Sequence, residues 1–200
     1  MDGVCYLHNG WQSLVDSLKQ RAKSENGNKV TGPTNINTEN GNYLCTGQAV
    51  ELSNGNIVFV WKQDQNEYKY RVFDSNGDPL TDPLSVQNGG NRPDDLQIGS
   101  ISYVYLAANE QGQFLITYSS NKNNNYVGTL YNSDGTRIPI NGYHHFYLQP
   151  KDKYLFGTVG LDNGKFAIMY DTTTNEAMIQ IINHEGNVVQ SISIDKELFL

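Results

Sequence analysis

The chain has 200 residues, of which 38% are hydrophobic, and a formal net charge of -7 at pH 7. This composition suffices for one hydrophobic core. It argues against a nucleic-acid backbone as the main partner, because the clustered Lys and Arg residues that bind phosphates are absent. Abundant Gly, Asn and Tyr, with little Leu, favour strands and turns over helices.

The sequence also shows few features of targeting and few cysteines. The first ten residues have neither the basic nor the apolar region of a secretory signal peptide, and no later run reaches the roughly 18 apolar residues of a membrane span. We therefore expect no membrane insertion. Cys5 and Cys45 are the only cysteines, so the sequence predicts neither a disulfide framework nor a zinc site. No Asn-x-Ser/Thr sequon occurs, which argues against passage through a glycosylating pathway.

The first predicted element in chain order is a helix over residues 10–24. Its apolar residues recur on one helical face, with polar residues on the other. These apolar residues are Trp11, Leu14, Val15, Leu18 and Ala22. Gly27 would end the helix. A degenerate fourth repeat is the alternative, because Trp11 and Gly27 have the same separation as Trp61 and Gly77 later in the chain.

Residues 43–200 contain three copies of one unit, and residues 1–42 form an N-terminal segment. Each copy has a turn glycine, an apolar run that ends in an aromatic residue six positions later, and a second turn glycine about 22 positions after the first. The three series are Gly55, Trp61 and Gly77; Gly112, Tyr118 and Gly135; and Gly164, Tyr170 and Gly186. This self-similarity indicates tandem structural repeats at about 43–90, 101–145 and 154–200.

Each copy contains four segments with the composition of strands. The pair Asn54-Gly55 predicts a tight hairpin in which both residues have positive φ, and the unbroken apolar run that follows predicts a strand covered on both faces. The expected strands are 44–52, 57–62, 68–73 and 79–86; 102–107, 114–119, 126–131 and 137–140; and 155–159, 166–171, 178–182 and 188–194. Residues 88–99 and 141–153 are predicted to be links without strands.

A four-stranded antiparallel meander repeated in tandem is the form of a β-propeller blade. We therefore predict an all-β, β-propeller-like array of four-stranded antiparallel repeats, with or without the N-terminal helix. A β-trefoil and a β-sandwich are the alternatives. Three copies are fewer than the blades of a closed propeller. Closure would need the N-terminal segment as a fourth blade, a longer polypeptide, or a homo-oligomer.

The motifs of the first copy also suggest a family. The run from Leu52 to Trp61, which reads Leu-Ser-Asn-Gly-Asn-Ile-Val-Phe-Val-Trp, and the later Phe-Asp-Ser-Asn-Gly ending at Gly77 resemble tandem propeller-like repeats of large bacterial and protist surface or secreted proteins. The first copy matches best. The other copies have Tyr in place of Trp, and the third has Ile182 in place of the second aromatic residue. This resemblance implies an extracellular or cell-surface location.

Candidate binding residues lie on the two predicted links. Asp94 and Asp95 are the acidic cluster of one link, and an aromatic and histidine cluster lies on the other. Together the candidates are Asp94, Asp95, Tyr143, His144, His145 and Tyr147. Adjacent histidines on an extended chain point in opposite directions, so one metal ion seldom binds both. We predict no catalytic residue, no metal site and no cofactor.

Two further patterns have a structural and a functional interpretation. Asp74, Asn76 and Asp78 alternate as in a calcium loop, but no bidentate Glu follows, so turn chemistry explains them better. Four tyrosines alternate along predicted strands and could form either an aromatic binding face or part of the core. They are Tyr68, Tyr70, Tyr103 and Tyr105.

The three copies share no catalytic constellation, which favours a non-enzymatic interaction module. Such a module would bind a protein or a glycan through its inter-repeat loops, in an adhesive or scaffolding role. One alternative is a propeller-type carbohydrate-active enzyme, which requires two carboxylates roughly 5–9.5 Å apart in one pocket. Another is a structural subunit of a larger assembly that docks through residues 10–24.

Overall fold

The computed structural model describes residues 44–64, 67–93, 98–120, 122, 125–148, 155–171 and 176–195. This part of the chain contains thirteen strands and no helix, and therefore no helix long and apolar enough to cross a membrane. The predicted helix at residues 10–24, Cys5, and the candidates Asp94 and Asp95 lie outside the described residues, so these interpretations stay predictions.

The strands form three antiparallel sheets, one from each predicted repeat, and in every sheet the main strands pair in chain order. Sheet 1 contains β1 (Leu44–Glu51), β2 (Ile57–Lys62), β3 (Tyr68–Phe73) and β4 (Leu84–Ser85). Sheet 2 contains β5 (Ile101–Ala108), β6 (Phe114–Ser120), β7 (Asn125–Tyr131) and β8 (Arg137–Ile138), and β9 (Phe146–Leu148) also pairs with β7. Sheet 3 contains β10 (Leu155–Gly160), β11 (Phe166–Asp171), β12 (Glu176–Ile182) and β13 (Val188–Asp195). The described part of the chain is therefore all-β with three antiparallel sheets, as predicted, but sheet 2 has five strands and not four.

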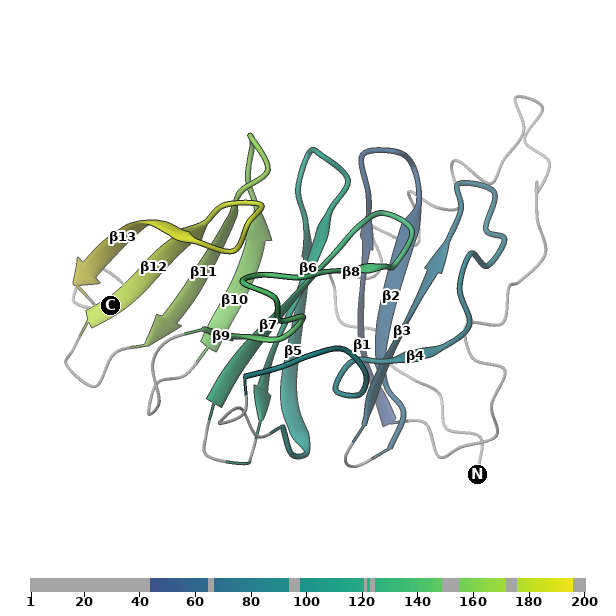
Figure 1. The fold of residues 1–200 in the computed structure, drawn as a ribbon, viewed down its shortest axis with the longest axis horizontal. Helices are drawn as coiled ribbons and strands as arrows, with labels where there is room; N and C mark the ends of the chain where they lie inside the picture. The colour runs from purple at the N-terminus through teal and green to yellow at the C-terminus, as the bar shows by residue number, and fades with distance from the viewer. Residues whose placement is uncertain are drawn as a thin grey trace.

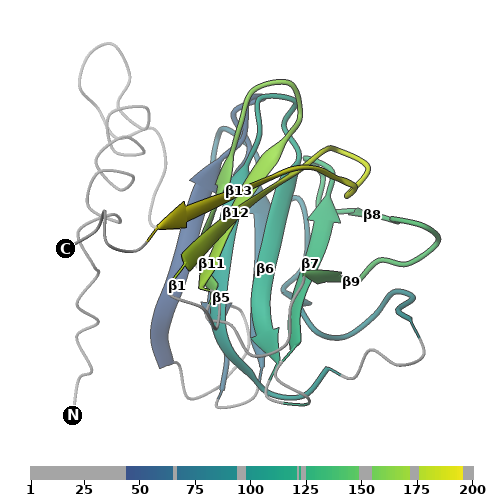
Figure 2. The same ribbon diagram turned by 90° about the vertical axis from the view of Figure 1, so that its left-hand side faces the viewer.

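The three sheets stand in a row, with sheet 2 in the middle (Figure 1). The first strand of sheet 2, β5, contacts the first strands of both neighbours, β1 and β10. One hydrophobic core lies between sheets 1 and 2, and a second lies between sheets 2 and 3. No sheet closes on itself among the described strands. Figure 2 looks onto sheet 3, at the end of the row.

The burial of the second strand of each sheet depends on the position of that sheet in the row. In β6, between two cores, six of the seven residues are buried. In β11, at the end of the row, buried and half-buried residues alternate. The equivalent run in β2 was predicted to be covered on both faces, but Phe59 and Trp61 are only half-buried. A continuous apolar run therefore does not distinguish a middle sheet from an end sheet.

The hairpin loops correct the predicted turn geometry. Only Gly55 of the pair Asn54-Gly55 has positive φ. Gly55 N–H donates to the carbonyl of Leu52, and Leu52 N–H donates to the carbonyl of Asn56. This is a three-residue loop in which glycine takes the left-handed position after a type I turn. The same pair of backbone bonds recurs around Gly77, Gly112, Gly135 and Gly186.

The outer edges also differ from the prediction. The fourth strands of sheets 1 and 2 were expected at 79–86 and 137–140, yet β4 and β8 have two residues each. Three prolines in these segments, Pro79, Pro83 and Pro139, have no N–H to donate to a neighbouring strand. Conversely, the predicted link 141–153 contains β9, which follows the tight turn at Asn141-Gly142.

Candidate functional site

A pocket of about 360 Å³ lies between sheets 1 and 2. Strands β1, β2, β3 and β5 supply its walls. The described lining residues are Gly47, Gln48, Val60, Lys62, Tyr68, Ser102, Tyr103, Val104 and Tyr105. Lys62 is the one charged side chain among them, and none of them is a carboxylate. The pocket therefore combines a cation, hydroxyl groups, an amide and aromatic rings.

Gln48 fixes the wall between the two sheets. Its Nε2 donates to the carbonyl of Val104 at 3.0 Å, and Leu106 N–H donates to its Oε1 at 2.8 Å. The side-chain amide thus satisfies two backbone groups of β5 that face β1. Because both ends of the amide are held, this wall of the pocket is preorganised.

A β-bulge directs Tyr103 outward. The pairing of β5 with β6 shifts between Ile101 and Val104, and both residues inside the shift are exposed. Tyr103 N–H donates to Ser119 Oγ at 3.1 Å, while its side chain is 61% exposed. A bulge changes the direction of side chains relative to regular alternation. The pocket therefore has an exposed phenol ring at its edge.

Lys62, Tyr68 and Tyr105 also line the pocket, whereas Tyr70 does not. Lys62 Nζ lies 5.9 Å from the ring centroid of Tyr68, within cation–π range. Tyr68 and Tyr70 are buried, and the hydroxyl of Tyr105 donates to the carbonyl of Leu155 at 3.0 Å. Burial raises the pKa of Tyr105. Tyr68 and Tyr70 therefore belong to the core, Tyr105 is half-buried, and among the four tyrosines only Tyr103 presents an exposed ring.

The predicted histidine cluster lies elsewhere, against a segment of sheet 1. His145 is buried, and its Nε2 lies 2.8 Å from the carbonyl oxygen of Gly89, which requires Nε2–H as the donor. Nδ1 then has one lone pair, which accepts from the hydroxyl of Tyr118 or of Thr129; these oxygens lie 3.0 and 2.9 Å from it. Burial lowers the pKa of His145 to about 4. His145 is therefore neutral at neutral pH, with its proton on Nε2.

Two neighbours of His145 attach to the same segment. His144 N–H donates to the carbonyl of Asn91 at 2.7 Å, and Asn91 N–H donates to His144 Nδ1 at 2.9 Å. Arg137 Nη2 donates to the carbonyls of Ser85 and Asn88, at 2.8 and 2.7 Å. We call Arg137, His144 and His145 the clasp, because they fasten residues 85–91 of the first repeat to sheet 2.

The four candidate binding residues that the structure describes lie in different surroundings. Tyr143 is exposed and follows the Asn141-Gly142 turn, while Tyr147 packs against the first core. None of the four candidates Tyr143, His144, His145 and Tyr147 is among the lining residues of the pocket. A binding role for them, and for Asp94 and Asp95, stays a prediction.

The alternating carboxylates of the first repeat belong to a turn. Asp74 Oδ1 accepts the backbone N–H groups of Asn76 and Asp78, each at 2.9 Å. The bond from Asp78 is the main cause of the lowered pKa of Asp74. Within the described part of the chain, no group of three His, Cys, Asp or Glu side chains could hold a metal ion.

Sequence reasoning did not find Gln48, Lys62 or Ser102. Lys62 does carry a signal, since it is the first charged residue after an apolar run. Gln48 and Ser102 carry none, because their significance depends on the contact between two repeats that are far apart in sequence.

No family model matches the chain, and no curated protein matches it. Among solved structures it is similar to a quinonprotein alcohol dehydrogenase-like protein from Bacteroides thetaiotaomicron, with a TM-score of 0.46 and 14% identity over 74% of this chain and 33% of that one. It is also similar to a protein of unknown function from Bacteroides caccae, with a TM-score of 0.38 and 11% identity over 72% of this chain and 44% of that one. The chain thus spans about a third of the first structure and less than half of the second, and likenesses this weak carry no argument about function.

Proposed function

We propose that the chain is a non-enzymatic interaction module, built as an open propeller-like array, whose pocket between sheets 1 and 2 binds an oligosaccharide that carries a carboxylate. Two features support the array. Each sheet contains a meander of four strands that pair in chain order, to which sheet 2 adds β9, and the first strands β1, β5 and β10 lie next to one another, as the inner strands of propeller blades do.

The single observation that carries the ligand class is the exposed ring of Tyr103 in a pocket that also contains Lys62. An aromatic ring offers a flat apolar face with a polar tip, which suits stacking on a sugar ring. The Lys62 ammonium can form a charge-assisted hydrogen bond with a carboxylate. The hydroxyl of Ser102 can bond a sugar hydroxyl.

The same lining favours binding over hydrolysis. Glycoside hydrolysis generally uses a pair of carboxyl groups on either side of the scissile bond. The described lining residues contain neither Asp nor Glu. The carbohydrate-active enzyme therefore has less support at this pocket than the binding module. A protein ligand, the assembly subunit and the adhesive or scaffolding role stay predictions.

Calorimetric titration with an oligogalacturonate and with a neutral galactan oligosaccharide of equal length tests the proposal. We expect the acidic probe to bind more tightly, with an affinity that falls as salt is added. Lys62→Met should abolish this preference. Tyr103→Ala should weaken binding of both probes by about fivefold, since one stacking contact contributes about 1 kcal/mol.

Tyr143→Ala is the matched control, because Tyr143 is also an exposed tyrosine but does not line the pocket. Its affinities should equal those of the wild type. The proposal is wrong if neither probe binds, or if both pocket variants bind the acidic probe as the wild type does.

A further inference from the structure

The outer edges of the three sheets are unequal. Sheets 1 and 2 end in the two-residue strands β4 and β8, and the clasp fastens residues 85–91 across the gap between these sheets. Sheet 3 ends in β13, which has eight residues. β13 pairs with β12 with one shift in register, between Val188 and Gln190, so residues 190–195 pair without interruption. No other described strand pairs with the second side of β13. Among the described strands, sheet 3 therefore has a long outer edge that no other strand covers.

The side chains of β13 leave this edge accessible. Residues 188–193 are all exposed, and Ile192 is 39% exposed near the middle of the strand. Residues 187–194 contain neither a charged residue nor a proline. Natural proteins protect their edges with short strands, charges, prolines or bulges, because free N–H and C=O groups attract another strand. The middle of β13 has only strand-forming residues and small polar ones, so it is a template for strand addition.

We propose that β13 pairs antiparallel with β13 of a second copy of this chain, so that two copies of sheet 3 form one continuous sheet. An antiparallel pair of identical strands has a twofold axis, which closes the assembly at two copies. This inference concerns the edge of sheet 3 and does not depend on the pocket.

The pairing of β12 with β13 shows which side chains would meet. Ile192 lies opposite Ile179, and Ile179 lies opposite Met169, so these three side chains form an apolar row on the outward face. Ser191 and Ser193 point to the other face. A twofold axis at Ile192 would place each Ile192 opposite its copy, and each Ser191 opposite the Ser193 of the other chain. Like side chains would then meet on both faces, with no opposed charges in the centre.

Sedimentation of the whole chain at several concentrations, compared between the wild type and two lysine variants, tests this inference. The wild type should sediment as a dimer at about 100 μM, a concentration at which even weak self-association is populated. Ile192→Lys places two ammonium groups opposite each other at the twofold axis, and should sediment as a monomer. Circular dichroism should show that the variant keeps its strands.

Val159→Lys is the matched control. Val159 lies on the same outward face of sheet 3 and is 56% exposed, but it belongs to β10, at the inner edge. This variant should remain a dimer. The inference is wrong if the wild type is a monomer, if it forms larger open-ended assemblies, or if Ile192→Lys remains a dimer. Dissociation by Val159→Lys would also contradict it, because that result would indicate face-to-face stacking.

Discussion

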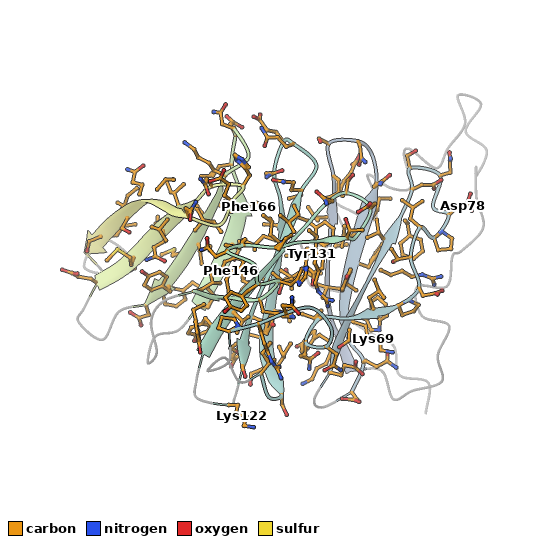
Figure 3. The ribbon with its side chains drawn as sticks, viewed as in Figure 1. Lys69, Asp78, Lys122, Tyr131, Phe146 and Phe166 are labelled. Atoms are coloured by element: carbon orange, nitrogen blue, oxygen red, sulfur yellow. The ribbon has the colours of Figure 1, made fainter. Side chains whose placement is uncertain are left out.

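The two interfaces between sheets use equivalent faces but different chemistry. By strand register, Ile57, Phe114 and Phe166 occupy the same position in the three copies. The core between sheets 1 and 2 contains a cluster of aromatic rings: the ring of Tyr131 lies 4.8 Å from that of Tyr70 and is stacked 4.6 Å from that of Phe114. The residue equivalent to Tyr131 in sheet 3 is Ile182, and the second core is mainly aliphatic. Figure 3 shows Tyr131 in the middle sheet and Phe166 in sheet 3.

The first interface is also fastened by polar side chains. Arg137 and His145 of the clasp bind backbone carbonyls of residues 85–89, and Gln48 binds two backbone groups of β5. In the second interface, the described hydrogen bonds of side chains include one from the hydroxyl of Tyr105 to the carbonyl of Leu155 and one between the hydroxyls of Thr117 and Thr158. The repeat therefore determines which faces pack, whereas residues outside the repeat pattern make one interface specific. Three changes test this difference.

The largest expected effect is on the second interface, where two backbones approach closely. A Cβ atom on Gly160 would overlap the carbonyl oxygen of Ala108 in β5, and a backbone atom cannot move without its strand. Gly160→Ala should therefore lower the free energy of unfolding by about 3 kcal/mol or more, as for a severely overpacked site. Urea denaturation measures this loss.

Gly157→Ala provides the control for the same strand. A Cβ atom at Gly157 would meet no atom within 4 Å, and neither glycine has positive φ. This variant should unfold within about 0.5 kcal/mol of the wild type. Equal losses in the two variants would mean that strand propensity, and not the close approach of β10 to β5, limits substitution.

The next effect is a pH dependence that belongs to the first interface. Burial lowers the pKa of His145 from 6.5 to about 4. His145 therefore binds a proton below about pH 6.5 in the unfolded chain, but only below about pH 4 in the folded protein. The free energy of unfolding falls as pH falls through this window. At 1.36 kcal/mol per pH unit, the loss approaches about 3 kcal/mol near pH 4 and is absent above about pH 7.

Denaturation of His145→Asn at several pH values measures this contribution. The variant should be less stable at neutral pH, because the carbonyl of Gly89 loses its donor, but it should lack the added fall in stability between about pH 6.5 and pH 4. His184→Asn, which changes an exposed histidine, should keep the wild-type slope. If His145→Asn also keeps that slope, His145 does not cause it.

The sequence predicts strands well and contacts between repeats poorly. The bounds of β2, β3 and β11 match the predicted ranges, because the turn glycines and apolar runs are local signals. The fourth strands of sheets 1 and 2 were predicted too long, since prolines interrupt their hydrogen bonding. The pocket could not be predicted, because Lys62 and Ser102 belong to different copies and meet only when the sheets stack.

Two local features also escaped prediction. The outward direction of Tyr103 follows from a bulge that has no clear signal in sequence. To predict the clasp, one would need to know that His145 faces a backbone carbonyl of another repeat. Adjacent histidines in an aromatic segment indicated a cluster of some kind, but burial and partners decide whether such a cluster binds a ligand or fastens two sheets.

The smallest effect concerns the hydroxyls of Thr117 and Thr158, which lie 2.7 Å apart in the second interface. The equivalent positions in the first interface are Val60 and Leu106, both in an apolar environment. Thr158→Val should cost about 1 to 2 kcal/mol, because the buried hydroxyl of Thr117 would lose its partner. Thr117→Val should cost less, since Thr158 is only half-buried.

The double variant decides what this hydrogen bond contributes. With both hydroxyls replaced by methyl groups, no buried polar group is left unpaired, and the second interface gains the apolar pairing already present in the first. We therefore expect the double variant to unfold within about 0.5 kcal/mol of the wild type, with a coupling energy of about 1 kcal/mol or more in the double-mutant cycle. If the two single losses simply add, the hydroxyls do not act as a pair, and the difference between the interfaces lies in the clasp and the aromatic rings alone.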